Sequence, residues 1–253
     1  MSRPFTKMQG LGNDFVVFEG PFVPAPSLVA AICDRRRGIG ADGVLVVARG
    51  GPAPAAVQMG YWNADGSAAE MCGNGLRCAA RYARDRNWVD TVAFVVDTPV
   101  GPRQVVMGDL VTAELGPVVR RGVVQVDGLT VWLAEVGNPH AVTWVDDLGV
   151  APVTTSGPLL ERHPSFPGGT NVEFASTRGR SLIELRVWER GVGETLACGT
   201  GAAATAAVAA DLGLVDLPVT IRLPGGDLTV DLRDDRAYIT GPADTVFAGE
   251  WPG

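Results

Sequence analysis

Short apolar segments bounded by glycine, proline, asparagine or aspartate recur along most of the chain, and this pattern predicts a protein rich in β-strands. Residues 182–188 alternate imperfectly between apolar and polar side chains, which is typical of a half-buried strand. The other expected strands have a similar length and similar flanking residues, and they cover residues 4–9, 44–48, 57–62, 92–96, 103–107, 130–136, 141–145, 219–223 and 227–232.

Helical segments are expected to be few. Ser27 is a candidate N-terminal cap for a helix that continues through Arg36 and ends at Gly38, because glycine readily adopts the conformation that terminates a helix. We therefore interpret the three arginines at 35–37 as the end of this helix rather than as a phosphate-binding site. Two more helices are expected directly after Cys72 and Cys198.

The two helices after the cysteines differ in polarity. Seven of the nine residues in 202–210 are alanine, and the lack of a polar stripe predicts a helix enclosed by neighbouring strands. After Cys72, by contrast, Arg77, Arg81 and Arg84 occupy one helical face at positions i, i+4 and i+7. Such a face usually lies in solvent, so we expect these three arginines to be exposed.

Two motifs occur twice in the chain at nearly the same separation. Met-Cys-Gly-Asn-Gly at 71–75 aligns with Ala-Cys-Gly-Thr-Gly at 197–201, and the two cysteines lie 126 positions apart in a chain of 253 residues. Gly-Asn-Asp-Phe at 12–15 aligns with Gly-Asn-Pro-His at 137–140. Independent matches at one spacing predict two copies of a single β-rich unit.

The repeat sets the expected domain boundaries. We expect an N-terminal lobe over residues 1–116 and a C-terminal lobe over 117–240, joined near 115–117. A final strand within about 241–253 is expected to return to the N-terminal lobe.

The composition is that of a globular protein, because 46% of the residues are hydrophobic and 19% are charged. A net charge of −7 without a basic stripe argues against nucleic acid as a partner. No apolar tract has the length of a signal peptide or membrane span, so we expect no membrane association. Four cysteines are too few for a disulfide scaffold, which favours the cytoplasm. Cys33 and Cys78 are expected to be buried as small apolar residues.

Lysine is almost absent from the chain. Of the 21 basic residues only Lys7 is a lysine, and pyridoxal phosphate needs a lysine to hold it. The Gly-x-Gly-x-x-Gly pattern at 38–43 precedes an expected strand, whereas a dinucleotide site requires the pattern to follow one. The cysteines include no Cys-x-x-Cys pair of the kind that binds zinc. We therefore expect neither a cofactor nor a metal.

The two cysteine turns are the candidate chemical groups. A thiol at a helix N-terminus faces backbone N–H groups and the positive end of the helix dipole, so we expect its pKa to fall below the usual value of about 8.5. The adjacent glycines allow an anionic group to approach the backbone. Cys72 and Cys198 are expected to face one bound molecule from opposite sides of a cleft. A thiolate on one face and a thiol on the other can invert a stereocentre.

Further motifs extend this pattern from one end of the chain to the other. They include Asn-Ala-Asp-Gly-Ser at 63–67 and Gly-Thr-Asn-Val-Glu at 169–173. The complete set covers residues 10–15, 37–43, 63–67, 71–78, 137–140, 169–173, 188–195 and 197–201. In this order the motifs are specific, and the chain resembles the diaminopimelate epimerases, pyridoxal-independent enzymes of bacterial lysine and cell-wall precursor synthesis.

The resemblance implies an α+β fold of two pseudo-symmetric β-barrel-like lobes, each around a central helix, with the active site between them. It also implies that the substrate is diaminopimelate, which the enzyme interconverts between the LL and meso forms. Cys72 and Cys198 match the catalytic acid–base pair of the family. Because the family is usually dimeric, we expect a homodimer.

The resemblance also assigns substrate contacts. The turns at Gly73-Asn74 and Gly199-Thr200 match those that hold the α-carboxylate at the reacting centre. The residues that match the remaining substrate contacts are Asn13, Asn63, Asn138, Asn171, Glu189 and Arg190.

Four positions are notable for a further reason. His140 and Glu189 match the residues that tune the pKa values of the two cysteines. Arg190 suits a distal carboxylate, because a guanidinium can bind a carboxylate through two hydrogen bonds. Gly43 is a departure, since some family members carry a glutamine there that touches the substrate.

Two alternatives remain open at this stage. One is a related isomerase, such as a proline racemase, a hydroxyproline epimerase or dehydratase, or a phenazine-pathway enzyme. The proline enzymes typically have histidine where this chain has Asn74, and Asp-Arg-Ser-Pro where it has 194–197, and the phenazine enzymes lack the paired cysteines. The other is a redox switch in which Cys72 and Cys198 form a reversible disulfide.

Overall fold

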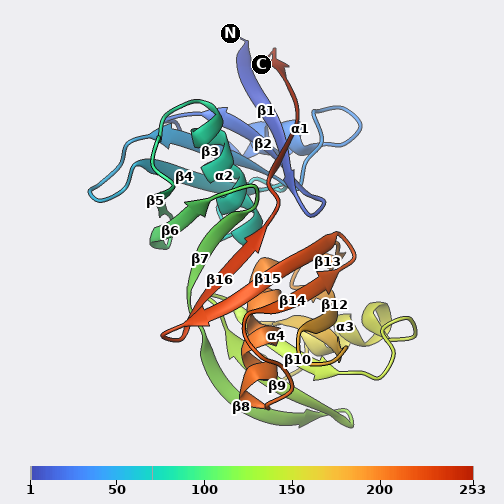
Figure 1. Ribbon diagram of the computed structural model, residues 1–253. Helices are drawn as coiled ribbons and strands as arrows, with labels where there is room; N and C mark the ends of the chain where they lie inside the picture. Colours follow the sequence, from blue (N-terminus) through green and yellow to red (C-terminus); the bar gives the residue numbers. More distant parts are fainter. Residues whose placement is uncertain (1, 70, 253) are drawn as a thin grey trace. The chain divides into compact units, whose positions relative to one another are not determined.

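The computed structural model describes residues 2–69 and 71–252. The chain forms two compact units. Unit 1 consists of Met1–Ala113 together with Gly241–Gly253, and unit 2 consists of Glu114–Thr240. Within the described residues both units are built mainly from β-strands, as the sequence pattern predicts, and they contain two helices each. Figure 1 shows the elements with their labels.

The strands of unit 1 include both ends of the chain. The antiparallel pair of β1 and β17 runs from Arg3 opposite Trp251 to Gln9 opposite Asp244, which brings the N-terminal and C-terminal strands side by side (Figure 1). The strands of this unit are β1 (Arg3–Gly10), β2 (Asn13–Glu19), β3 (Gly43–Arg49), β4 (Val57–Asn63), β5 (Ala93–Thr98), β6 (Gly101–Met107) and β17 (Asp244–Trp251). The next strand along the chain after β6, β7 (Val111–Pro117), contains the boundary between the units.

Helix α1 (Pro26–Cys33) is shorter than the sequence predicts. The prediction of a Ser27 cap is wrong, because Ala25 is the N-cap and its side chain forms no capping hydrogen bond. Pro26 begins the helix, where its fixed φ and missing N–H are tolerated. The helix ends at Cys33, and the Asp34 carboxylate accepts the backbone N–H groups of Arg36 and Arg37 in the turn that follows.

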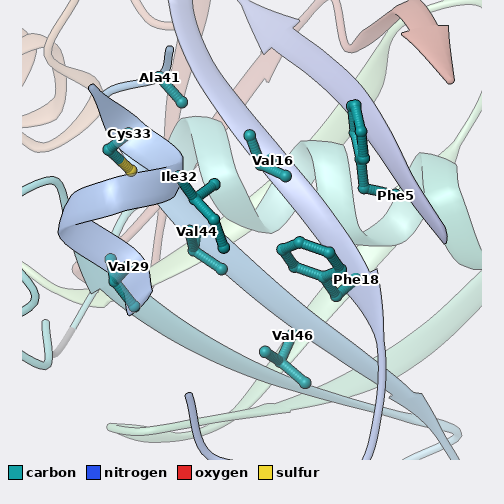
Figure 2. Close-up of a cluster of buried hydrophobic side chains, with 9 residues drawn as sticks. All are labelled: Phe5, Val16, Phe18, Val29, Ile32, Cys33, Ala41, Val44 and Val46. Carbon is teal, nitrogen blue, oxygen red and sulfur yellow. The ribbon is translucent and has the colours of Figure 1, made fainter. Parts of the chain in front are cut away.

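Helix α1 packs on the sheet of unit 1 through a compact apolar cluster (Figure 2). The cluster combines side chains from β1, β2, β3, α1 and the segment before β3, namely Phe5, Val16, Phe18, Val29, Ile32, Cys33, Ala41, Val44 and Val46. The second helix of the unit, α2 (Gly73–Asp85), packs against β1, β3 and β4. The start of α2 lies beside the first residue of β2, because the Asn74 side chain donates to Asn13.

Unit 2 repeats the order of elements in unit 1. In unit 1, β2 and β3 are parallel, β3 and β4 are antiparallel, and α2 follows. In unit 2, β10 and β11 are parallel, β11 and β12 are antiparallel, and the helix α4 follows. The strands of this unit are β8 (Val119–Val126), β9 (Leu129–Glu135), β10 (Pro139–Trp144), β11 (Asn171–Thr177), β12 (Leu182–Glu189), β13 (Gly193–Thr195), β14 (Val219–Leu223), β15 (Gly226–Arg233) and β16 (Arg236–Gly241), which ends at the boundary. The predicted internal repeat is therefore confirmed.

Helix α4 (Gly199–Asp211) is enclosed by strands, as its alanine-rich sequence predicts. Its residues are buried from the N-terminus through Ala209, and it packs against β9, β10, β11, β12, β14 and β15. The other helix of unit 2, α3 (Val153–Glu161), was not predicted, because it contains both Gly157 and Pro158. Tertiary packing explains the glycine, since a Cβ there would lie 2.7 Å from the Trp188 ring. Within the described residues no helix is both long and apolar enough to span a membrane.

The prediction that the arginines of α2 are exposed to solvent is wrong for Arg77. This side chain has an exposed fraction of 0%, whereas Arg81 and Arg84 lie nearer the surface and donate to backbone carbonyl oxygens. Helical spacing places the three arginines on one face but does not determine which part of that face the surrounding strands cover.

The two cysteines outside the repeated turns, Cys33 and Cys78, are buried, as predicted. Burial raises the pKa of Cys78 from its usual 9.0 to about 12. Because the folded-state pKa exceeds the unfolded one, the protonated thiol stabilises the fold below pH 9.0, and this contribution is lost as the pH rises through about 12.

We therefore expect the Cys78→Ala variant to become less destabilised, relative to wild type, as the pH rises. The difference in the free energy of unfolding should shrink by roughly 1.4 kcal/mol per pH unit above the usual thiol pKa. Urea unfolding of both proteins at about pH 8 and at about pH 10 measures this difference. A difference that is the same at both pH values would contradict the raised pKa of Cys78.

Candidate active site

In unit 1, Cys72 is the N-cap residue of α2. Its extended backbone, with φ −145° and ψ 110°, directs Sγ over the first turn of the helix. There Sγ accepts a hydrogen bond from the Gly75 N–H at 3.3 Å and lies 3.6 Å from Asn13 Oδ1, to which the thiol can donate. The predicted position of this thiol at a helix N-terminus is therefore confirmed.

Two asparagines lie beside the Cys72 thiol. Asn74 is buried in the first turn of α2 and donates from Nδ2 to Asn13 Oδ1 at 3.2 Å. Asn13 begins β2 and donates from its own Nδ2 to Asp42 Oδ2 at 2.9 Å. The fold thus brings Asn13, Asn74 and Cys72 together from segments far apart in the sequence.

Asn63 lies at the end of β4, directly opposite Gly43 of β3. Its Nδ2 donates to Ser67 Oγ at 3.0 Å, so the side chain is held in the turn that follows the strand. A Cβ at Gly43 would lie 2.5 Å from the Trp62 carbonyl oxygen and 2.6 Å from the Tyr61 ring. Position 43 therefore has no room for a larger side chain in this conformation.

In unit 2, Cys198 occupies the equivalent N-cap position of α4. Its φ of −121° and ψ of 110° again turn Sγ over the helix start, where it accepts the Gly201 N–H at 3.4 Å. The Thr200 hydroxyl lies 3.5 Å from Sγ, and Cys198 is 4% exposed within the described residues. The local geometry of the two cysteine turns is therefore the same.

The electrostatic surroundings of Cys198 are the opposite of those predicted. Its pKa is raised well above the usual thiol value, first because of burial and then because the Glu189 and Glu173 carboxylates lie close by. The hydrogen bond from the Gly201 N–H acts in the predicted direction but is outweighed. The prediction of a lowered pKa at both turns is therefore wrong for Cys198.

Buried polar residues line the β10 and β11 side of the α4 N-terminus. His140 Nδ1 lies 2.7 Å from Glu173 Oε1, and both side chains are fully enclosed. His140 Nε2 lies 2.9 Å from Asn138 Oδ1, so the ring is held at both nitrogens. A Cβ at Gly201 would lie 2.7 Å from Glu173 Oε1 and 3.4 Å from Cys198 Sγ, which shows how closely the carboxylate approaches the thiol turn.

Glu189 lies at the end of β12. It accepts a hydrogen bond from Thr195 Oγ1 at 2.5 Å and also bonds with the Cys198 thiol. Burial raises the pKa of Glu189, and the neighbouring Glu173 raises it further. Glu189 therefore favours the protonated form more than an ordinary glutamate does.

The side chains of Asn171 and Arg190 form hydrogen bonds with backbone groups of unit 2. Asn171 accepts the backbone N–H of Arg190 at 3.0 Å and donates to the Pro139 carbonyl at 2.9 Å. The Arg190 side chain leaves Glu189 in a different direction and donates from Nη1 to the Gly168 carbonyl at 3.0 Å. The two neighbouring side chains therefore have different partners, Thr195 for Glu189 and Gly168 for Arg190.

Three residues of these clusters were not predicted as site residues from the sequence. Glu173 contacts His140, Asp42 orients Asn13, and Arg77 contacts Asn74. Each of them belongs to one of the recognised motifs, so their positions were visible. Their contacts were not, because each contact joins side chains that only the fold brings together.

Each unit therefore carries a thiol at a helix N-terminus, where backbone N–H groups can also bind an anion. Among the described residues, no group of three or more histidine, cysteine, aspartate or glutamate side chains has a geometry that could hold a metal ion. The arrangement is suited to proton transfer next to a carboxylate.

The fold places the chain in a class of structurally related proteins. The hydroxyproline epimerase of Agrobacterium vitis aligns with a TM-score of 0.78 and 17% identity, over 99% of this chain and 91% of that one. A PhzF-family phenazine biosynthesis protein from Bacillus anthracis aligns with a TM-score of 0.79 and 14% identity, over 99% of both chains. These likenesses show a shared fold, and they confirm the predicted α+β class.

Sequence comparison then identifies the family. The family model described as diaminopimelate epimerase matches residues 5–120 and 132–246. The diaminopimelate epimerase of Moorella thermoacetica is 41% identical over 98% of this chain and 99% of its own length, and that of Microcystis aeruginosa is 42% identical over 100% of both. The chain belongs to the diaminopimelate epimerase family. It is accordingly an isomerase that epimerises diaminopimelate, and the alternative of a proline-type enzyme is set aside.

Proposed function

We propose that Cys72 and Cys198 are the two acid–base groups of the epimerase and act on opposite faces of the substrate α-carbon. The observation that carries this proposal is the duplicated thiol turn. Both cysteines are N-caps of 13-residue helices, and both accept the backbone N–H of the residue three positions further on. A reaction that must run in both directions needs such an equivalent group on each face.

The proposed reaction proceeds by transfer of one proton off the α-carbon and one proton onto it. The thiolate of one cysteine takes the α-proton, and the electron pair of the broken C–H bond moves towards the α-carboxylate as the carbon becomes planar. The thiol of the other cysteine then donates its proton to the opposite face. The configuration is inverted, and the two cysteines have exchanged their protonation states.

The negative charge that develops on the α-carboxylate needs stabilisation. We assign this role to the backbone N–H groups of Gly73-Asn74 and Gly199-Thr200, at the starts of the two helices. Both turns are buried within their units, which strengthens the interaction of their dipoles with a bound anion.

The raised pKa of Cys198 gives this cysteine a defined role in the substrate-free enzyme. Because burial, Glu189 and Glu173 all raise its pKa, Cys198 holds its proton at neutral pH. In that state it can act as the acid, and the reverse reaction uses its thiolate. We assign His140 and Glu189 to tuning this thiol, since they lie in the same buried cluster.

The remaining substrate contacts are assigned by their place in the family motifs and their proximity to the two turns. These residues are Asn13, Asn63, Asn138, Asn171, Glu189 and Arg190. Arg190 is assigned to the distal carboxylate, because its side chain points away from Glu189 and is exposed within unit 2. Among the described residues its guanidinium donates only to Gly168, which leaves further N–H donors for a ligand.

Further properties of the enzyme are proposed on chemical grounds. Proton transfer between thiols needs no cofactor, so we propose that the enzyme works without one. We also propose a cytoplasmic homodimer, which the exposed apolar side chains Val246 and Phe247 on the strand β17 support as a candidate interface.

Incubation of the enzyme with LL-diaminopimelate in D₂O tests the proposed mechanism. We expect meso-diaminopimelate to form with deuterium at the inverted α-carbon, because the donating thiol exchanges its proton with solvent. NMR follows both the product and its deuterium content. Turnover that transfers the original hydrogen to the product would contradict a two-thiol mechanism, and a disulfide-dependent change without turnover would favour the redox switch.

A further inference from the structure

Arg77 is a charged side chain in an unusual environment. It lies in α2, is fully buried and is the largest fully buried side chain among the described residues. Its guanidinium donates from Nε to the Pro242 carbonyl at 3.2 Å, from Nη2 to Asn74 Oδ1 at 2.9 Å and from Nη1 to the Gly73 carbonyl at 3.5 Å. All three acceptors are neutral.

A buried guanidinium surrounded by neutral acceptors is costly to desolvate. The fourteen ion pairs of the described residues do not include Arg77, and burial lowers its pKa from the usual value. Gly10 makes room for the group, since a Cβ at this position would lie 3.1 Å from Arg77 Nη2. A hydrocarbon side chain would fill this space without the desolvation penalty, so the charge points to a role other than packing.

The hydrogen bonds of Arg77 determine which way the Asn74 amide faces. A guanidinium only donates, so the oxygen of Asn74 must point towards Arg77 and its Nδ2 must point away. That Nδ2 then donates to the oxygen of Asn13. The orientation of one amide is therefore passed to the next.

A carboxylate fixes the other end of this chain of hydrogen bonds. Asp42 only accepts when ionised, so Asn13 must direct its Nδ2 towards Asp42 and its Oδ1 towards Asn74 and Cys72. With a donor-only group at one end and an acceptor-only group at the other, both amides have one favoured orientation. Each amide would lose a charge-assisted hydrogen bond if it flipped.

We propose that Arg77 is a positioning residue for the reacting end of the active site. Through Asn74 it holds Asn13 in the orientation that presents an oxygen to the Cys72 thiol. The inference rests on the proposed roles of Asn13, Asn74 and Cys72 in catalysis. Arg77 would then contribute to catalysis although, on this assignment, it touches neither the Cys72 thiol nor the substrate.

The first test is the variant Arg77→Lys, assayed with LL-diaminopimelate after the folded fraction has been measured by circular dichroism. A lysine keeps the charge but cannot donate to both Asn74 Oδ1 and the Pro242 carbonyl with the same geometry. We expect kcat to fall by about tenfold to a hundredfold because the reacting groups are misoriented. KM should change by less than about threefold, because Arg190 and the backbone turns still bind the substrate.

Arg81→Lys is the matched control on the same helix. Arg81 donates only to the backbone carbonyls of Gly108 and Asp109 among the described residues, so its replacement should leave kcat and KM unchanged. A neutral variant, Arg77→Gln, can still donate to Asn74, and we expect it to retain more kcat than an Arg77→Met variant that cannot donate.

A double-mutant cycle distinguishes positioning from a purely structural role. If Arg77 acts through Asn74 and Asn13, the Arg77→Lys substitution should lower kcat by less than about threefold when Asn13 has already been replaced by alanine. Losses that multiply in the double variant, or an Arg77→Lys enzyme with wild-type kcat, would overturn the proposal. Failure of Arg77→Lys and Arg77→Gln alike to fold would also overturn it, because the guanidinium would then serve stability. Absence of turnover in the wild-type enzyme would instead contradict the proposed function.

Discussion

Replacing either Cys72 or Cys198 by alanine is expected to lower kcat/KM for epimerisation by roughly 100-fold to 10,000-fold, the range for loss of a general acid or base. In the proposed mechanism each variant keeps only one of the two groups that inversion requires. The fold should survive, because both side chains are small and alanine leaves little empty volume. Polarimetric or NMR assays of LL-diaminopimelate turnover measure the effect.

The two variants should nevertheless differ from an enzyme that has lost all chemistry. The remaining thiol can still remove a proton on its own face and return a solvent proton to that face. We expect each variant to exchange the α-hydrogen of one stereoisomer with D₂O without inverting it. The two variants should show opposite stereoisomer preferences, because their remaining thiols act on opposite faces.

Cys78→Ala is the matched control for these substitutions. Cys78 is a buried cysteine of the same helix that begins after Cys72, and it should be dispensable for turnover. An epimerase with near-normal kcat/KM after Cys72→Ala or Cys198→Ala, in a preparation whose sequence is verified by mass spectrometry, would refute the two-thiol mechanism.

Arg190→Ala is expected to lower kcat/KM for diaminopimelate by about 100-fold or more. The substrate carries a second amino acid group, and on the proposed assignment its distal carboxylate loses water and pairs with Arg190 on binding. Leaving such a charge unpaired costs roughly 3 kcal/mol or more. On the proposed assignment the α-carboxylate is bound by the backbone N–H groups of the two helix starts, so the loss should concern the distal end alone.

Arg190→Lys should recover only part of this loss. A lysine ammonium supplies a point charge but cannot form the paired hydrogen bonds of a guanidinium with a carboxylate. The matched control is Arg178→Ala, which removes an arginine from an exposed ion pair with Glu184 in the same unit. Such a pair contributes little, so activity should be unchanged. Wild-type kcat/KM for Arg190→Ala would remove Arg190 from the binding site.

Much of the site was predictable because its key residues lie in short motifs. A cysteine followed by Gly-x-Gly before a helical segment indicates an N-cap thiol, and both helices begin at the expected residues. The repeat of this motif also indicated a duplicated unit. These predictions need only a few neighbouring residues, because helix starts are set by local backbone conformation and capping.

The errors have a common cause. Ser27 is a good capping residue, yet α1 begins at Pro26 after the N-cap Ala25, and its side chains Val29, Ile32 and Cys33 pack into the apolar cluster of Figure 2. Likewise, the spacing of Arg77, Arg81 and Arg84 is that of a solvated helical face. The fold buries only the first of them, and no local pattern distinguishes it from the others.

The family, the duplicated architecture and the location of two thiols at helix N-termini follow from the sequence alone, since each is indicated by short motifs whose own residues are close together in the chain. The tertiary structure decided the electrostatics. It buries Cys198 and brings Glu189 and Glu173 close to it, which raises the pKa of a thiol that its helix alone would lower. It also encloses Arg77 beside Asn74. Burial and charge act through space over a few ångströms, and those distances are set by strands that are far apart in sequence.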